Sequence, residues 1–327
     1  MDTIPKAMTY DSTLLDDSAP WKPVVGSVAA VVLGLVLLVA AWGKAINPEA
    51  FVEQIRFEGL DFFGLAYLVA LMAIAVEVAL GTALVLGLRR WWVMVPTVVL
   101  VLFFLFLTGR AYWRFEQGLI SSAEICGCFG NLVSRTPAQA FWQDLALLGL
   151  LTILCFVGRP KKKHHRPVVR LALVFVLTAA GLALSVMAPR LPIDNLATRL
   201  KPGVSVSDLC AGARDDPARI CLDTLIAELR EGHHWIVMTG LEEEIFLAGV
   251  PRLNEAVLDG SERHLYVVTA AAEETVGSFS WTQAPAFEVR EAPEALLRPL
   301  HRRLPRSFEV VDGEVIATQS GLPPEGF

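Results

Sequence analysis

Five long apolar runs alternate with short polar stretches in the first 190 residues of the chain. They cover residues 24–42, 62–88, 91–113, 141–157 and 168–188. A helix needs about 20 apolar residues to cross roughly 30 Å of hydrocarbon, so each run predicts a membrane-spanning helix. Indole rings prefer the headgroup region of a bilayer. Tryptophans stand at the ends of these runs, at positions Trp21, Trp42, Trp91, Trp92, Trp113 and Trp142.

The pattern changes after about residue 203, where short apolar stretches alternate with polar ones. The stretches at 234–239 and 264–269 predict strands, and an apparent helix at about 242–258 lies between them. A helix from Asp216-Pro217 to about Gly232 is expected before this β-α-β unit, and another at about 293–302 after it. In the last stretch, residues 304–319, Asp312-Gly313 is typical of a hairpin turn between two strands. The pattern predicts an α/β domain.

Composition supports a membrane protein. Of the 327 residues, 54% are hydrophobic and 19% are charged, which is too apolar for an ordinary soluble protein. Membrane lipid is therefore an expected partner. The net charge of −6 argues against nucleic acid as a partner. Five cysteines are too few for a disulfide scaffold.

Positive charge in the short loops predicts the orientation. Residues 158–166 carry five Lys or Arg, and Arg89-Arg90 link the second and third runs. Both loops should face the cytoplasm under the positive-inside rule, and so should the N-terminal tail. The loop at 121–135 and everything after about residue 189 should then face the outside of a bacterial inner membrane. That compartment is oxidising.

The loop at 121–135 contains the sequence Cys126-Gly127-Cys128. A disulfide across one glycine closes a very small ring, and Gly127 lets the backbone bend further than another residue would. Departure from relaxed geometry makes a disulfide easier to reduce, so the pair is suited to electron exchange. The alternative is two free loop thiols. A metal site is not predicted, because no His or further Cys lies nearby in the loop.

Three stretches of the membrane half resemble the MauE branch of the DoxX-like membrane proteins. They are GKAINPEAF at 43–51, the acidic Glu77 of the second run, and CGCFG at 126–130. The resemblance covers about residues 22–158. It implies a four-helix membrane unit that supports disulfide formation or thiol redox transfer, as MauE is associated with methylamine utilisation and with maturation of a disulfide-rich periplasmic enzyme subunit.

Individual residues of the membrane half carry their own expectations. Glu77 is in mid-span, where an ionised carboxylate is costly, so it should face the interior of the bundle. In a functional role, Glu77 would relay protons or contact a quinone headgroup. In a structural role, it would be a neutral side chain that is hydrogen-bonded between helices. Lys44 is expected to contact lipid phosphate, or otherwise a thiolate. Arg110 is expected to extend toward the interface. Cys155 is expected to be a packing residue.

The order of elements in residues 203–327, with Pro305 just before the hairpin, resembles a thioredoxin-like fold. Pro305 would take the place of that fold's cis-proline. A working thioredoxin carries Cys-x-x-Cys after its first core strand, but residues 238–246 read MTGLEEEIF. The domain should therefore run no dithiol chemistry there. Cys210 and Cys221 are expected to form a structural disulfide, the alternatives being a resolving pair for Cys126 and Cys128 or free thiols.

The sequence thus predicts an α-helical membrane protein with a thioredoxin-like α/β domain. The expected parts are a disordered cytoplasmic tail (1–21), a MauE/DoxX-like four-helix unit (22–158), a basic loop with a fifth spanning helix (159–189), a linker (190–202) and an extracytoplasmic domain (203–327). The expected function is thiol–disulfide redox work on an extracytoplasmic client or redox partner, with Cys126, Cys128 and Glu77 as working residues. No metal is expected, and quinone is the cofactor class considered. The alternative is a non-catalytic assembly factor or chaperone; transport is a weaker one.

Overall fold

The computed structural model describes residues 21–119, 136–158, 167–212, 219–259 and 264–325. Within them, five helical segments are long and apolar enough to cross a membrane, so the predicted number of spans is confirmed. The fourth segment is interrupted by a π-helical turn. The segments are α1 (Trp21–Ile46), α3 (Ala66–Val85), α4 (Trp91–Glu116), α5 (Pro137–Asp144) with η4 (Leu145–Gly149) and α6 (Leu150–Val157), and α7 (Pro167–Met187).

Close contact between α1 and α3 organises the bundle. A Cβ atom on Gly34 would lie 2.6 Å from the carbonyl oxygen of Gly81, and one on Gly81 would lie 2.9 Å from that of Gly34. Only glycine allows the two backbones to approach this closely, which is a common device between membrane helices. The core beside this contact contains Leu33, Leu37, Leu84, Met94, Val101 and Phe104.

A buried arginine fastens the end of the bundle where α3 turns into α4. Arg89, expected in a basic loop, is only 8% exposed. Its guanidinium donates hydrogen bonds to the carbonyl of Gly158 at 2.9 Å and to the hydroxyl of Ser27 at 2.8 Å. A Cβ atom on Gly26 would lie 2.6 Å from the Cα atom of Gly158. The guanidinium and the two glycines therefore hold α1 and α6 together at this end.

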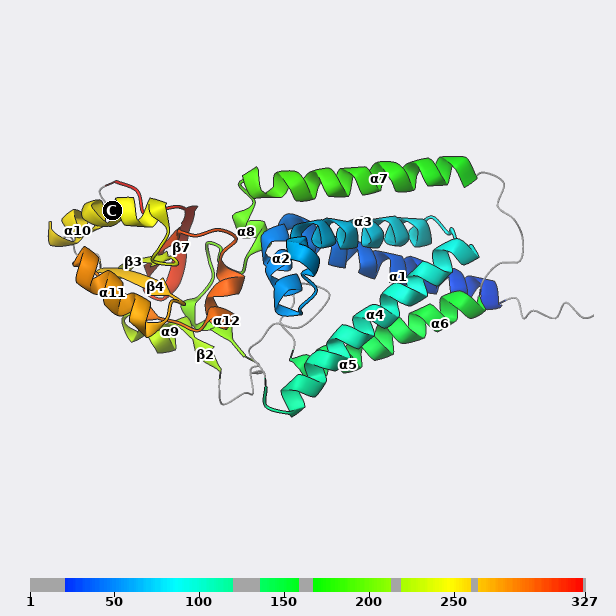
Figure 1. The fold of residues 1–327 in the computed structure, drawn as a ribbon, viewed down its shortest axis with the longest axis horizontal. Coiled ribbons are helices and arrows are strands. Elements are labelled where there is room, and N and C mark those ends of the chain that lie inside the picture. The colour runs from blue at the N-terminus through cyan, green and yellow to red at the C-terminus, as the bar shows by residue number, and fades with distance from the viewer. Residues whose placement is uncertain (1–20, 120–135, 159–166, 213–218, 260–263, 326–327) are drawn as a thin grey trace, which may run out of the picture.

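The short helix α2 (Pro48–Phe57) lies at the opposite end of the bundle (Figure 1). Asn47 caps it by accepting a hydrogen bond from the amide of Ala50, and Pro48 occupies its first turn, where proline is favoured. Its buried side chains Val52 and Ile55 pack with the start of α3. A short turn, η2 (Phe62–Gly64), connects the two helices.

The C-terminal domain contains a five-stranded sheet of order β5-β4-β3-β6-β7. Strands β3, β4 and β5 are parallel, while β6 is antiparallel to β3, and β7 to β6. This confirms the predicted β-α-β unit and the hairpin that follows it. The strands are β3 (His233–Met238), β4 (His264–Thr269), β5 (Glu288–Glu291), β6 (Arg306–Val311) and β7 (Glu314–Ser320).

Helices cover both faces of this sheet. The helices α10 (Glu244–Leu258) and α11 (Glu273–Gln283) pack through Phe246 and Phe279 on the face that carries Val237. The opposite face carries Ile236 and Phe308 and is covered by short helical segments. These segments are α9 (Leu222–Leu225), η7 (Ala227–Arg230), α12 (Glu294–Leu297) and η8 (Arg298–Leu300).

Two expected features of a thioredoxin-like domain are present. The Leu304–Pro305 peptide bond is cis and directly precedes β6, as the sequence predicts. Asp312 and Gly313 form the hairpin turn with positive φ angles of 47° and 82°. Together with the strand order, these features give the domain a thioredoxin-like fold.

Two predicted helices of this domain are wrong in extent. Residues 220–221 form the strand β2 (Ile220–Cys221), which pairs with β1 (Cys210–Ala211), and Asp216-Pro217 lie outside the described residues. Pairing with β1 holds Cys221 extended, so the helical segments begin after it, as α9 and then η7. The helix predicted at 293–302 is divided at Arg298, because Pro299 has no amide hydrogen for an α-helical bond.

The connection between the bundle and the sheet is short and partly helical. It contains η5 (Ala188–Arg190) and α8 (Asp194–Ala197), and η6 (Val206–Asp208) follows it. Figure 1 shows the C-terminal domain at the end of the bundle where α2 lies. The last turn of α4 and the first turn of α5 lie at that same end.

Candidate functional site

Lys44 and Glu77 form an ion pair inside the membrane bundle. Lys44 is in the last turn of α1 and is 3% exposed, and Glu77 is in the middle of α3 and is fully buried. The prediction that Glu77 faces the interior is therefore confirmed. The expectation that Lys44 contacts lipid phosphate is wrong, because the buried carboxylate of Glu77 takes its ammonium group instead.

Two aromatic rings flank the ammonium group of Lys44. Its Nζ atom lies 5.1 Å from the ring centroid of Phe51 and 5.0 Å from that of Phe104. A cation near the face of an aromatic ring is attracted by the ring quadrupole, and more strongly when it is shielded from water. Since Phe51 belongs to α2 and Phe104 to α4, four helices converge on one charged pair.

One oxygen of the carboxylate remains without a hydrogen bond. Lys44 donates to Oε1 of Glu77, whereas Oε2 has no hydrogen-bond partner among the described residues. A buried polar atom without a partner costs roughly 1–3 kcal/mol, so each such atom in a native structure needs an explanation. An atom in this position can accept a hydrogen bond from a bound molecule.

A cavity of about 110 Å³ lies beside the ion pair. The ion pair, Gln54, Glu58 and Thr108 supply its polar groups, and the rest of its wall is apolar. α2, α3 and α4 supply nearly all of the wall. The lining residues are Lys44, Phe51, Gln54, Ile55, Glu58, Leu60, Val69, Ala73, Glu77, Leu100, Phe103, Phe104, Leu107, Thr108 and Ala111.

Arg110 connects α4 to the end of α2 beside this cavity. Its Nη1 atom donates to the backbone carbonyl of Glu58 at 3.1 Å and lies 3.8 Å from the carboxylate of the same residue. The side chain of Arg110 was expected to extend toward the interface, and its guanidinium contacts the end of α2 and remains 37% exposed. Since Glu58 also lines the cavity, this contact fixes the position of α2 over it.

Cys126, Gly127 and Cys128 lie outside the residues that the structure describes. The described residues nearest to them in the chain are Leu119, just after α4, and Thr136, which caps α5. The hydroxyl of Thr136 accepts from the amide of Gln139, whose side chain accepts from the amide of Thr136. The role of the cysteine pair as the working site stays a prediction.

The other cysteines have defined positions. Cys210 and Cys221 are joined by a disulfide between opposite residues of β1 and β2. Arg219 donates to Sγ of Cys210 at 3.0 Å. Cys155 has a free thiol and is fully buried in the bundle core, in agreement with its predicted packing role.

The end of strand β3 is where a thioredoxin would carry its dithiol. Met238, the last residue of β3, pairs with Arg306, and Pro305 is adjacent to that pair. The turn after β3 contains Gly240 and Leu241, the latter with a φ angle of 63°. No cysteine lies between residues 238 and 246, all of which the structure describes. The fold is present here without its usual redox group.

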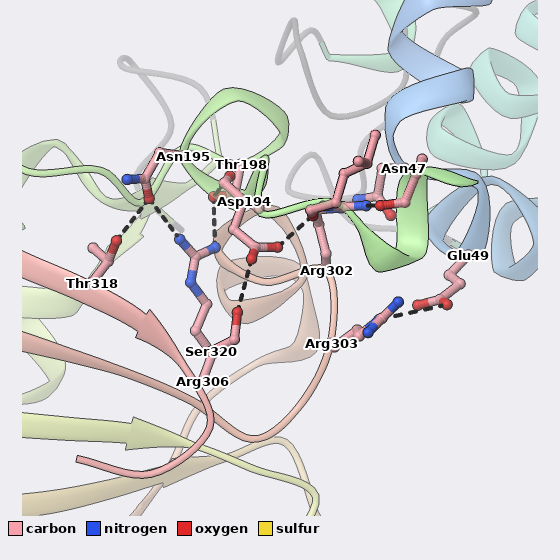
Figure 2. Close-up of polar contacts among 12 residues, drawn as sticks. Asn47, Glu49, Asp194, Asn195, Thr198, Arg302, Arg303, Arg306, Thr318 and Ser320 are labelled. Atoms are coloured by element: carbon pink, nitrogen blue, oxygen red, sulfur yellow. Dashed lines mark hydrogen bonds and ion pairs between the residues drawn. The ribbon is translucent and has the colours of Figure 1, made fainter. Parts of the chain in front are cut away.

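An arginine-rich segment connects this domain to its linker, and no sequence motif marks it as a contact region. Four arginines lie between residues 298 and 306. Figure 2 shows two of them, Arg302 and Arg306, directed at residues of the linker. Arg302 pairs with Asp194 at 3.3 Å. Arg306 donates to the hydroxyl of Thr198 at 2.7 Å and to the side-chain oxygen of Asn195 at 3.3 Å.

Among the residues that the structure describes, Arg306 is the largest side chain that is almost fully buried. It also donates to the carbonyls of Leu300 and Leu200, at 2.7 and 3.1 Å. Burial lowers the pKa of Arg306 to about 10, and nearby Asp194 opposes that shift. The guanidinium therefore remains charged at neutral pH and holds the linker against the sheet. The close spacing of four arginines was the feature of the sequence that could have pointed to this segment.

The same segment reaches the membrane bundle. Arg298 donates to the backbone carbonyl of Ala50 at 3.0 Å and lies 3.7 Å from the carboxylate of Glu53. Arg303 forms an ion pair with Glu49 (Figure 2), and its Nε atom lies 4.0 Å from the carboxylate. Ala50, Glu49 and Glu53 lie on α2, whose residues Phe51, Gln54 and Ile55 line the cavity. One short helix therefore contacts both the cavity and the C-terminal domain.

The fold and the site define a polytopic membrane protein with a charged pair buried in its bundle and an α/β domain at one end. Comparison with known proteins agrees that the first half of the chain is a membrane unit. Residues 22–158 match the family described as methylamine utilisation protein MauE, so the membrane unit is similar to that family. No curated protein matches the chain.

A solved structure is similar to part of the chain. It is described as a thiol:disulfide interchange protein, DsbE, from Chlorobium tepidum, and it is 15% identical in sequence. The similarity covers 38% of this chain and 89% of that one, with a TM-score of 0.30. At this level it adds nothing to the thioredoxin-like assignment, which rests on the strand order and on Pro305.

Proposed function

We propose that the protein is a membrane-bound thiol–disulfide redox protein that supports disulfide formation in, or maturation of, an extracytoplasmic client. Cys126 and Cys128 are the exchanging thiols in this proposal. A MauE-type membrane unit, a Cys-Gly-Cys sequence and a thioredoxin-like domain occur together in one chain. The end of α4 and the start of α5, between which the cysteine pair lies in the chain, are at the side of the bundle where the thioredoxin-like domain lies.

That last observation carries the proposal. Leu119 and Thr136 border the segment with the cysteines, and the helices they follow and precede both reach the end of the bundle occupied by α2. A client held by the C-terminal domain would be on the same side of the membrane as the two thiols. The turn after β3 carries no cysteine, so the membrane unit has to supply the dithiol.

Orientation follows from the charges at the other end. The basic stretch at 158–166 connects α6 to α7, and Arg90 directly precedes α4. Figure 1 shows the end of α6 and the starts of α4 and α7 at the end of the bundle that is remote from the C-terminal domain. We propose that this end faces the cytoplasm of a bacterial cell. A periplasm-active reporter fused after Ala188 should be active, and a membrane-impermeant thiol reagent should reach Cys126 and Cys128 in intact spheroplasts. Labelling of these thiols only from the cytoplasmic side would contradict the oxidising compartment that the proposal requires.

The redox role is tested by trapping. In Cys128→Ser, Cys126 can still attack a client but has no neighbour to release the product, so mixed disulfides should accumulate. Cys126→Ser should trap through Cys128 or not at all, which would identify the attacking sulfur. Cys155→Ser is the matched control, because that thiol is buried in the bundle and should trap nothing. Adducts are detected on non-reducing gels and identified by mass spectrometry.

The non-catalytic alternative has its own support. The described turn after β3 lacks cysteine although the domain keeps its cis-proline, which favours a domain that holds a client without exchanging electrons. Normal maturation of the client by the Cys126→Ser/Cys128→Ser variant would favour the assembly-factor function over the redox function.

A further inference from the structure

We propose that the cavity beside Lys44 and Glu77 binds the headgroup of a membrane quinone. The inference rests on the proposed function for its purpose, since a protein that makes disulfides needs an electron acceptor. The binding itself rests only on described residues. It can therefore be tested in a protein whose Cys126 and Cys128 have both been removed.

The polar groups of the cavity match the chemistry of a quinone. A quinone ring carries carbonyl oxygens, which accept hydrogen bonds, and the Lys44 ammonium is a donor at the cavity wall. Its reduced form carries hydroxyl groups, which donate, and Oε2 of Glu77 is a buried acceptor without a hydrogen bond among the described residues. Thr108 lines the same cavity, but its hydroxyl already donates to the carbonyl of Phe104 at 3.0 Å.

The apolar part of the cavity matches a flat ring. The ring centroids of Phe51 and Phe104 lie 5.1 and 5.0 Å from the Lys44 ammonium, and Phe103 is a third aromatic residue of the wall. The volume of about 110 Å³ is of the order of the ~150 Å³ cavity that is known to admit a benzene ring. A single ring with small substituents is the expected occupant.

The position of the cavity gives it access to the bilayer. Phe103 belongs to the spanning helix α4 and is 41% exposed, so this wall of the cavity also faces lipid. A quinone is carried in the bilayer by a long apolar tail. Its headgroup could enter beside Phe103 while the tail remained among lipid chains. A soluble electron acceptor would not need a cavity that opens toward lipid.

The chemistry balances with this acceptor. When Cys126 and Cys128 form a disulfide, the two thiols lose two electrons and two protons as the S–S bond forms. The quinone takes up two electrons and two protons and becomes the hydroquinone. Glu77 is placed to hold one of those protons at Oε2, and Lys44 is placed to orient the ring oxygen. Glu77 and Lys44 would then be ligand-contacting residues, whereas the structure alone shows them as an ion pair.

Photolabelling of the full-length protein in nanodiscs tests the binding. The probe is an azido-benzoquinone with a decyl tail, and the competitor is the same quinone without the azide. Labelling should be saturable, should be removed by the competitor, and should map to peptides of α2, α3 or α4. It should persist in the Cys126→Ser/Cys128→Ser variant. If labelling persists there and the thiol exchange still fails to occur in wild type, the proposed function is wrong and the quinone site stands.

Two variants with one control make the result specific. Ala73→Leu adds bulk to the cavity wall and leaves the ion pair in place, so it should abolish competitor-sensitive labelling. Glu77→Gln keeps a hydrogen-bond acceptor for Lys44 but no proton-holding carboxylate, so labelling should remain and reduction of the bound quinone should slow. Ala75→Leu, two positions away on α3 and outside the cavity wall, should label as wild type does. Labelling that no competitor removes, that maps to other helices, or that survives Ala73→Leu would overturn the proposal and indicate general partitioning into lipid.

Discussion

Arg298, at the start of the turn η8, donates a 3.0 Å hydrogen bond to the backbone carbonyl of Ala50 in α2, 248 positions earlier in the chain. A guanidinium that bonds a backbone carbonyl recognises the position of a helix and not the identity of a side chain. The contact therefore places the C-terminal domain against the helix that also lines the cavity.

Replacing Arg298 should loosen α2. In Arg298→Ala, loss of the hydrogen bond should cost about 1 kcal/mol, and the partly exposed ion pair with Glu53 should add little. Hydrogen exchange of peptides from α2 should accelerate about fivefold, which is the factor that corresponds to this energy. Arg290→Ala is the control, because its ion pair with Glu288 lies within β5. Equal exchange in both variants would show that Arg298 does not hold α2.

Removing one member of the buried ion pair should be worse than removing both. Lys44→Met leaves the carboxylate of Glu77 buried without its partner and should destabilise the protein by about 3–5 kcal/mol. The double variant Lys44→Met/Glu77→Met should recover most of that loss, because it buries no charge at this position. Thermal unfolding in nanodiscs measures both. A double variant as unstable as the single one would mean that packing, and not charge, dominates here.

The disulfide between Cys210 and Cys221 should stabilise the C-terminal domain without taking part in exchange. It closes a loop between residues that are 11 positions apart, and its loss should cost about 3 kcal/mol through the freedom that the unfolded chain regains. Calorimetry of Cys210→Ser/Cys221→Ser should show a lower transition for the domain. When Cys128→Ser is combined with these two changes, mixed disulfides should still form through Cys126. Accumulation of mixed disulfides in this variant while Cys128 is intact, without loss of stability, would instead identify Cys210 and Cys221 as the resolving pair.

His301 should make the domain sensitive to mild acid. Burial, together with the nearby charges of Arg306 and Arg298, lowers the pKa of His301 from its ordinary 6.5 to about 4. The unfolded chain therefore binds this proton at a higher pH than the folded chain does. The stabilising contribution is complete above pH 6.5 and is lost as the pH falls toward 4. After allowance for the partial exposure of the side chain, the loss should be about 2 kcal/mol.

The contribution of His301 is isolated by comparing the wild-type protein with His301→Phe, whose side chain cannot be protonated. Between pH 7 and pH 4.5, the wild-type transition of the domain should fall further than the transition of the variant. Calorimetry in the same nanodiscs measures both. A parallel decline would assign the acid sensitivity to carboxylates elsewhere in the domain.

The sequence was sufficient for features that depend on local pattern. Long apolar runs predicted the five spans, and mid-span position alone predicted that Glu77 faces inward. Asp312-Gly313 predicted the hairpin, because few other residue pairs adopt two successive positive φ angles. The cis-proline at Pro305 was implied by the resemblance of this region to a thioredoxin-like fold.

Features that depend on distant pairing were missed. The partner of Glu77 is 33 positions away, and nothing in the sequence around Lys44 distinguishes it from a lysine at the membrane surface. The helix α11 was not predicted because the stretch EETVGSFSWTQ has little amphipathic pattern, and β5 is a short strand at the sheet edge with charges at both ends. Cys221 was placed on a helix because the pairing of β1 with β2 leaves no periodic signal over two residues.

The contact between Arg298, Arg303 and α2 has a consequence for how the two halves of the protein can part. Each of the groups that α2 offers there, the carbonyl of Ala50 and the carboxylates of Glu49 and Glu53, is as well solvated by water as by a guanidinium. Separating these contacts would break one hydrogen bond and two ion pairs, whose groups water can solvate. The membrane bundle and the C-terminal domain can therefore separate at this contact and associate again while each keeps its own fold.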